Sequence, residues 1–135
     1  MTEVFVDVGA ASIESAAPTE GTPPVDPEAL RALRHLAEAG VDVFVVTGGG
    51  VQPSPELRAA AIAVLPSVPK RPSAPAFYLT CDIERCQGSS ARLRTILIGG
   101  APPNSSVRRC DAVARDVQAA AMEILVADAM PSGVR

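Results

Sequence analysis

The sequence contains no tryptophan, and its aromatic residues are one tyrosine and three phenylalanines among 135 residues. With so few rings, the hydrophobic core must be built from Val, Leu, Ile and Ala. Such a core suits parallel strands covered by Ala-rich helices. The length is that of one ordinary domain. We therefore expect a single domain over residues 1–135.

An excess of positive charge is also missing. The chain has 12 Lys and Arg against 15 Asp and Glu, with the two signs interspersed, so there is no basic stripe to neutralise a nucleic acid. No apolar run reaches the roughly 18 residues of a membrane-spanning helix, and the N-terminus lacks the positive start of a secretion signal. We expect a cytoplasmic protein without nucleic-acid or membrane partners.

Cysteine and histidine are scarce, with three and one residues respectively. An odd number of cysteines without a secretion signal argues against a disulfide framework, so reduced thiols are expected at Cys81, Cys86 and Cys110. The spacing of Cys81 and Cys86 is too wide for a usual zinc pair, and His35 lies within a helical pattern. A zinc site is not predicted.

The sequence does contain alternating strand and helix patterns. Asp26-Pro27-Glu28 and Ser54-Pro55-Glu56 each offer an N-cap, a proline at the first helical position and an acid for the helix dipole. The pattern predicts strands at 3–8, 41–47, 76–81 and 93–98, and helices at 27–39, 54–66 and 107–129. This order predicts an α/β fold, a three-layer α/β/α sandwich with a mainly parallel, Rossmann-like sheet.

Two connections stand out by composition. Residues 10–25 form a long loop rich in Ala, Ser, Thr, Gly and Pro, and residues 66–75 form a proline-rich linker. Long connections in small domains are often functional or partly disordered. The loop at 10–25 is therefore a place to look for substrate contacts or mobility.

Polar residues follow the predicted strands, where ligands bind in parallel α/β sheets. Asp7, Thr47, Cys81 and Asp82 fall on this edge, together with Gly99 and Gly100. Asp7 and Thr47 can also act as structural caps or turn formers. The glycines at 48–50 offer amide hydrogens to an anion, or serve only a sharp turn, because no P-loop Gly-Lys-Ser follows them.

The first strand with Asp7, the helix at 27–39 and the strand ending in Thr47 together resemble the haloacid dehalogenase (HAD)-like hydrolase superfamily. The similarity covers most of the chain. In that family the first strand ends in Asp-x-Asp, the second ends in Thr or Ser, a Lys precedes the fourth strand and acids follow it. The resemblance implies a Mg²⁺-dependent phosphatase site in which one carboxylate attacks phosphorus and the other transfers a proton.

Matched to this pattern, Asp7 is the candidate nucleophile, Thr47, Gly48 and Arg94 are candidate phosphate-binding residues, and Asp7, Asp82 and Asp111 are candidate Mg²⁺ ligands. Arg94 is considered, with Arg85 and Arg92, as a substitute for the lysine.

The sequence departs from the family at several positions. Gly9 replaces the second acid of Asp-x-Asp, no acid directly follows the fourth strand, and the sole lysine, Lys70, precedes the third strand. With one clear acid left, Mg²⁺ affinity should be poor.

Three functions follow from these observations. The preferred prediction is a HAD-like domain that has lost phosphatase activity and serves as a binding or assembly module. The alternative is a Mg²⁺-dependent phosphatase with Asp7 as nucleophile. The third is a nucleotide or anion binder that uses the glycine-rich turn, although the dinucleotide-binding Gly-x-Gly-x-x-Gly is missing.

Two kinds of partner are expected. The site residues predict a small phosphorylated ligand. The helix predicted at 107–129 is apolar on more than one face, which predicts a homodimer.

Overall fold

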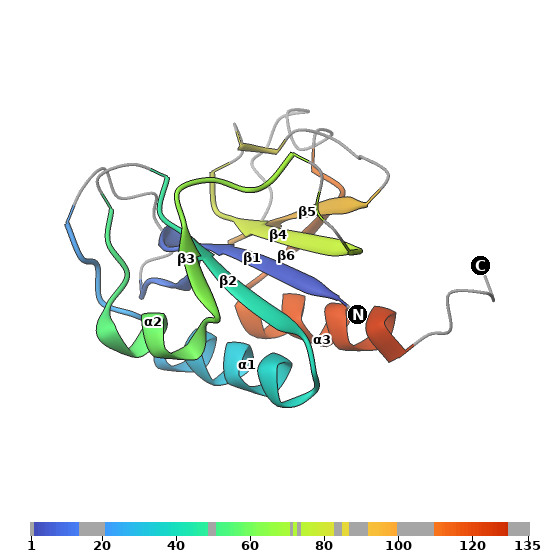
Figure 1. Cartoon of the computed structure of the whole chain (residues 1–135), viewed down its shortest axis with the longest axis horizontal. Helices are drawn as coiled ribbons and strands as arrows, with labels where there is room; N and C mark the ends of the chain where they lie inside the picture. The colour runs from blue at the N-terminus through green and yellow to red at the C-terminus, as the bar shows by residue number, and fades with distance from the viewer. Residues whose placement is uncertain are drawn as a thin grey trace.

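A six-stranded, entirely parallel sheet forms the centre of the molecule, with the strand order β3-β2-β1-β4-β5-β6 (Figure 1). The computed structural model describes residues 2–13, 21–48, 51–70, 72, 74–82, 85–86, 92–99 and 110–129. Its elements are β1 (Glu3–Asp7), the 3-10 helix η1 (Gly9–Ala11), α1 (Pro27–Glu38), β2 (Asp42–Val46), α2 (Pro55–Ala60), β3 (Ala63–Leu65), β4 (Ala76–Thr80), β5 (Leu93–Ile98), β6 (Ala112–Ala114) and α3 (Val117–Ala129).

The predicted starts of the first two helices are confirmed. The side chain of Asp26 accepts a hydrogen bond from the Glu28 amide at 3.0 Å, and that of Ser54 accepts one from the Leu57 amide at 3.3 Å. Each cap satisfies an amide hydrogen that has no partner within its helix.

Loss of the first cap gives a modest prediction. We expect Asp26→Ala to lower the free energy of unfolding by about 1 kcal/mol, because the Glu28 amide loses its acceptor. Urea unfolding followed by circular dichroism measures the change. Asp26→Asn, which keeps an acceptor oxygen, should cost less than half as much, and an equal loss in both variants would contradict the capping role.

The second and third helices are shorter than predicted. The prediction of helix over 54–66 is wrong beyond Ala60, because residues 63–65 form β3 beside β2. The prediction of helix from 107 is wrong at 112–114, which form β6 beside β5, while 107–109 lie outside the described residues. The periodicity of a short apolar run fits a helix or a strand equally well. Here both runs form strands because they pair with a neighbouring strand of the sheet.

The α/β class and the parallel sheet are confirmed. Within the described parts of the chain, all three helices lie on one face of the sheet, where α1 packs between α2 and α3 (Figure 1). Their apolar side chains join those of the strands in the main core, which includes Val4, Val6, Leu33, Leu79 and Ile124.

The opposite face is covered differently. Successive strands run from β1 to β3 in one direction, and the chain then returns to place β4 on the other side of β1. A right-handed crossover in this reverse direction must pass over the face opposite the helices. In the proline-rich linker, Val68 packs against a second cluster that contains Phe5, Val46 and Tyr78.

The strand order also marks where a site belongs. Strands β1 and β4 are neighbours although residues 8–75 separate them in sequence, and they flank the point where the direction of the crossovers reverses. Ligands of open α/β sheets bind beyond the carboxyl ends of the strands at such a point. Asp7 ends β1 there, and Thr80 ends β4.

Parts of the loop predicted at 10–25 have regular structure. It begins with η1, and Ser12 forms an antiparallel bridge with Val25, while residues 14–20 lie outside the described residues. Among the helices that the structure describes, none has the length and apolar character needed to cross a membrane.

Candidate functional site

Asp7 is a buried carboxylate at the end of the central strand, with 4% of its surface exposed. The Tyr78 hydroxyl lies 2.8 Å from Oδ1 and 2.9 Å from Oδ2, and the Thr80 hydroxyl donates to Oδ2 at 2.6 Å. Tyr78 and Thr80 are alternate residues of β4, so both point to the same face as Asp7. The carboxylate therefore ties the ends of β1 and β4 together.

Arg85 supplies the third donor to the same carboxylate. Its Nη1 lies 3.1 Å from Asp7 Oδ2, its Nη2 lies 3.4 Å from the Gly48 carbonyl oxygen, and its Nε lies 3.7 Å from Asp82 Oδ2. The backbone amide of the arginine also donates to the Asp82 carbonyl at 3.0 Å. The guanidinium thus contacts residues at or just beyond the ends of β1, β2 and β4.

The electrostatics of this cluster are dominated by burial. Burial raises the pKa of Asp7 above its usual 3.8, and the hydrogen bonds from Thr80 and Tyr78 and the charge of Arg85 oppose that rise only in part. Burial and the neighbouring Asp7 charge together hold the pKa of Tyr78 well above its usual 10. Tyr78 is the sole tyrosine of a chain without tryptophan, so its ultraviolet signal reports on this site alone.

A small hollow opens beside the carboxylate. Its cavity volume is about 20 Å³, and it is lined by Asp7, Val8, Gly9, Thr47, Val51, Cys81, Asp82 and Arg85. Ligand pockets for drug-sized molecules range from about 300 to 1,000 Å³. The hollow is therefore suited to a small group rather than to a whole large substrate.

Several sequence-predicted residues do meet at this hollow. Asp7, Thr47 and Asp82 line it, and Gly48 contacts Arg85 at its edge. The Thr47 hydroxyl, however, donates to the Leu65 carbonyl at 3.4 Å rather than into the hollow. Glycines 49 and 50 lie outside the described residues, so the predicted anion-binding turn stays a prediction.

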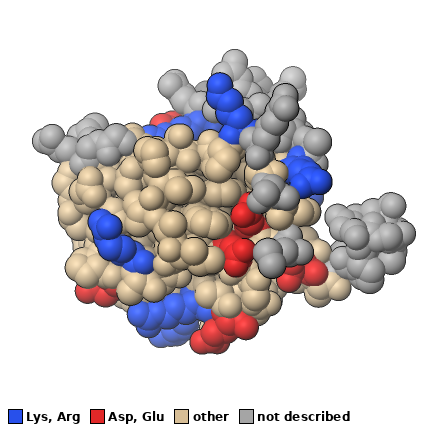
Figure 2. All heavy atoms as spheres, in the orientation of Figure 1, with Lys and Arg blue, Asp and Glu red and all other residues tan. Residues whose placement is uncertain are grey.

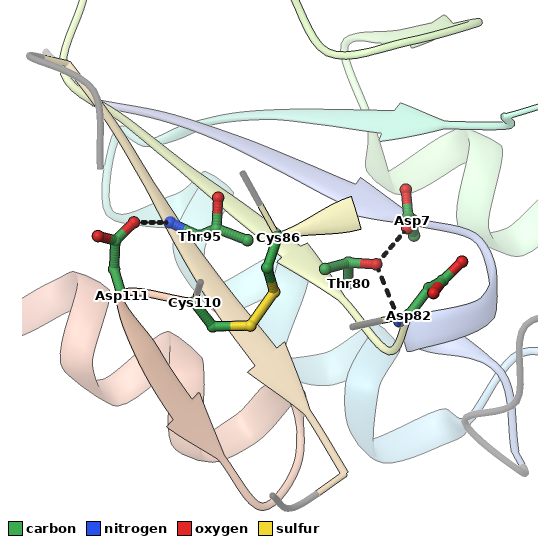
Figure 3. Close-up of a disulfide and its surroundings, with 7 residues drawn as sticks. All are labelled: Asp7, Thr80, Asp82, Cys86, Thr95, Cys110 and Asp111. Carbon is green, nitrogen blue, oxygen red and sulfur yellow. Dashed lines mark hydrogen bonds between the residues drawn. A yellow bond between two sulfur atoms is a disulfide. The ribbon is translucent and has the colours of Figure 1, made fainter. Parts of the chain in front are cut away.

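Two predicted residues lie elsewhere. Arg94 is an exposed residue near the start of β5, level with Phe77 of β4, which places it about 10 Å below the strand ends at roughly 3.3 Å per residue. Asp111 precedes β6, three strand spacings or about 14 Å from β1. Its carboxylate accepts a hydrogen bond from the Thr95 amide at 2.7 Å and points away from Asp7 (Figure 3).

These positions have a plain cause. The prediction placed Asp111 on a helix and Arg94 beside the site because strand pairing was not visible in the sequence. Once 112–114 pairs with β5, Asp111 becomes the residue that continues that ladder. Arg94 is exposed to solvent and lies near the start of β5, at the end of the strand remote from Asp7. Neither residue joins the cluster around Asp7.

Sequence reasoning missed Tyr78 and Thr80, and named Arg85 only as one of three possible lysine substitutes. The signal for the two hydroxyls was their spacing of two, which puts both on one face of β4. Without knowing that β4 lies beside β1, that spacing could not be connected to Asp7.

The two carboxylates at the hollow, Asp7 and Asp82, are paired with an arginine in this structure. The described residues contain no group of three or more His, Cys, Asp or Glu side chains that could hold a metal ion. The guanidinium of Arg85 lies against Oδ2 of Asp7 and is also paired with Asp82. A cation already neutralises the carboxylates that Mg²⁺ would need.

A disulfide lies next to this cluster. Cys86 and Cys110, 24 residues apart, are bonded, whereas Cys81 is free (Figure 3). The prediction of reduced thiols is therefore wrong for Cys86 and Cys110. Counting cysteines could not reveal the bond, because only the fold brings the segment after β4 close to the residue before β6.

Solved structures with a similar fold include two phosphatases. The D,D-heptose 1,7-bisphosphate phosphatase from Burkholderia thailandensis is 19% identical, with a TM-score of 0.59 over 93% of this chain and 99% of that one. The D,D-heptose 1,7-bisphosphate phosphatase from B. bronchiseptica, complexed with magnesium and phosphate, is 14% identical, with a TM-score of 0.54 over 94% and 99%.

Comparison of the sequence with protein-family models gives no match, and neither does comparison with curated proteins. The likeness thus rests on the arrangement of the chain in space. At such low identity it extends to the fold and not to the activity of those phosphatases.

Proposed function

We propose that this chain is a HAD-like domain that does not hydrolyse phosphate esters and acts as a binding module. One observation carries the proposal: the carboxylate at the nucleophile position is engaged by three side chains of its own protein, Tyr78, Thr80 and Arg85. A carboxylate nucleophile must direct a lone pair at phosphorus, and a nearby cation must offset the charge of the phosphate. Asp7 instead serves as an internal anchor.

Gly9 supports the same conclusion. It lines the hollow two residues beyond Asp7, where the resembling family carries its acid-base carboxylate. A glycine can neither protonate a leaving group nor activate water. Even if Asp7 were released, the general acid would still be missing.

The alternative, a Mg²⁺-dependent phosphatase, draws support from the bisphosphate phosphatases that share the fold, one of them complexed with magnesium and phosphate. For this chain it requires Mg²⁺ to displace Arg85 from Asp7. A small phosphorylated ligand, bound without hydrolysis, remains compatible with the preferred function.

Hydrolysis of an aryl phosphate with and without Mg²⁺ tests the proposal. We expect no turnover above the uncatalysed rate in the wild type, with Mg²⁺ making no difference. Arg85→Gln, which removes the cation from the carboxylate while leaving Asp7 in place, should also be inactive because the general acid is missing. Mg²⁺-dependent turnover by the wild type that disappears in Asp7→Asn would overturn the proposal.

Association remains part of the proposal. On the face seen in Figure 2, positive and negative residues are interspersed and most of the surface is uncharged, in keeping with a partner other than a nucleic acid. Most of the apolar face of α3 packs within the chain, but Met122 and Val126 are exposed one turn apart. Light scattering after size exclusion tests the predicted homodimer.

The cytoplasmic location is proposed on the sequence grounds given above.

A further inference from the structure

We infer that the Cys86–Cys110 disulfide is a redox latch that holds Arg85 on Asp7. This inference rests on the proposed function, in which Arg85 is one of three side chains that engage the Asp7 carboxylate. Reduction of the disulfide would release the segment that carries Arg85 and make Asp7 available to the hollow. The device would couple the redox state of the surroundings to the state of the site.

The arrangement of the chain carries the argument. Arg85 and Cys86 are adjacent, so the atom that pairs with Asp7 and the sulfur that forms the bridge belong to consecutive residues. The arginine is held by the hydrogen bond of its amide to the Asp82 carbonyl and, through the next residue, by the disulfide. Both anchors act on the same short segment beyond β4.

The other half of the bridge is firmly placed. Cys110 precedes Asp111, whose amide donates to the Thr95 carbonyl at 2.9 Å and whose carboxylate accepts from the Thr95 amide at 2.7 Å. These two bonds attach the residue after Cys110 to the central part of β5. The disulfide therefore ties the arginine segment to the sheet itself, and Figure 3 shows the bridge lying between Asp111 and the Asp7 cluster.

The chemistry needs a dithiol as the reductant. One thiolate of the dithiol attacks one sulfur of the bridge, the bond between Cys86 and Cys110 breaks, and a mixed disulfide forms. The second thiolate then displaces the protein sulfur. Two electrons pass to the protein, its two cysteines end as thiols after taking up two protons, and the dithiol becomes a disulfide. In a reducing compartment such bridges are usually transient or redox-sensing.

Coupling between the latch and the ion pair must be reciprocal. If the disulfide favours the contact of Arg85 with Asp7, that contact must favour the disulfide by the same factor. The test therefore needs neither a ligand nor an activity. The disulfide is equilibrated with buffers of reduced and oxidised dithiothreitol, and the fraction of open bridges is measured by thiol labelling and mass spectrometry.

Arg85→Gln is expected to shift this equilibrium toward the reduced form by about fivefold, the lower end of typical coupling between sites. Arg94→Gln, which alters an exposed arginine outside the cluster, is the matched control and should leave the equilibrium unchanged. Asp7→Asn should shift it in the same direction as Arg85→Gln. The double variant should shift no further than the larger single change, because the two residues act through one contact.

A second measurement follows the site directly. Carbon NMR of the Asp7 carboxyl group should show a higher pKa in the reduced protein and in Cys86→Ser/Cys110→Ser than in the oxidised protein, because the opposing charge of Arg85 withdraws. An equilibrium in Arg85→Gln identical to that of the wild type, or an Asp7 titration unaffected by reduction, would overturn the latch. Neither result depends on whether the domain hydrolyses phosphate, so the proposed function stands or falls separately.

Discussion

Replacing Asp7 with alanine is expected to lower the free energy of unfolding by about 4 kcal/mol, because each buried hydroxyl left without an acceptor costs about 1–3 kcal/mol. The Tyr78 and Thr80 hydroxyls both donate to this carboxylate, and Tyr78 and Thr80 are 6% and 0% exposed. Arg85 loses its counter-charge at the same time. Chemical unfolding monitored by circular dichroism measures the loss.

The control for Asp7→Ala is Asp42→Ala. Asp42 is half-buried at the opposite end of the neighbouring strand β2, and its replacement should cost less than about 1 kcal/mol, as for most positions outside a buried polar network. Equal losses in the two variants would contradict the anchoring role. Asp7→Asn should fall between wild type and Asp7→Ala, because the amide oxygen still accepts one hydrogen bond.

The same anchor sets a pH dependence. Because burial raises the pKa of Asp7 above 3.8 in the folded protein, ionising this group costs more in the folded state than in the unfolded state. The stability contributed by Asp7 is therefore fully present below 3.8 and declines as the pH rises through the raised value. Comparing unfolding of wild type and Asp7→Asn across the acidic range isolates this slope, which should be missing from the variant.

Gly48→Ala is expected to lower the free energy of unfolding by about 2–3 kcal/mol, from left-handed backbone strain of roughly 1–2 kcal/mol and from loss of the Arg85 contact. Gly48 has a φ of +65°, and a Cβ at this position would lie 2.6 Å from both terminal nitrogens of Arg85. A side chain at this position fits only if the guanidinium shifts. The approach of Arg85 thus requires glycine at this position.

The chain offers a matched control in Gly40, which has a φ of +93° and where an added Cβ would meet nothing within 4 Å. Gly40→Ala should cost only the backbone strain, about 1 kcal/mol. In an Arg85→Ala background the cost of Gly48→Ala should fall to the same level, since the clashing side chain is gone. A cost that persists unchanged in that background would show that strain alone explains Gly48.

Local sequence patterns predicted the fold well where the physical cause was local. Asp26 and Ser54 cap their helices because a cap involves only neighbouring residues. The apolar strand before Asp7 and the one before Thr47 follow from composition and are paired as expected. The predictions were wrong at 63–65 and 112–114, where short apolar segments became strands only because an edge of the sheet was open to them.

The candidate site divides in the same way. The sequence alone determined that a single acid ends the first strand and that a glycine, Gly9, follows it two residues later. Only the tertiary structure decided what Asp7 contacts. Tyr78 and Thr80 reach it through the pairing of β1 with β4, and Arg85 reaches it over Gly48 beside a disulfide. These contacts join residues more than 70 positions apart, and the hydrogen bonds of a buried carboxylate depend on which strands are neighbours, which no local pattern specifies.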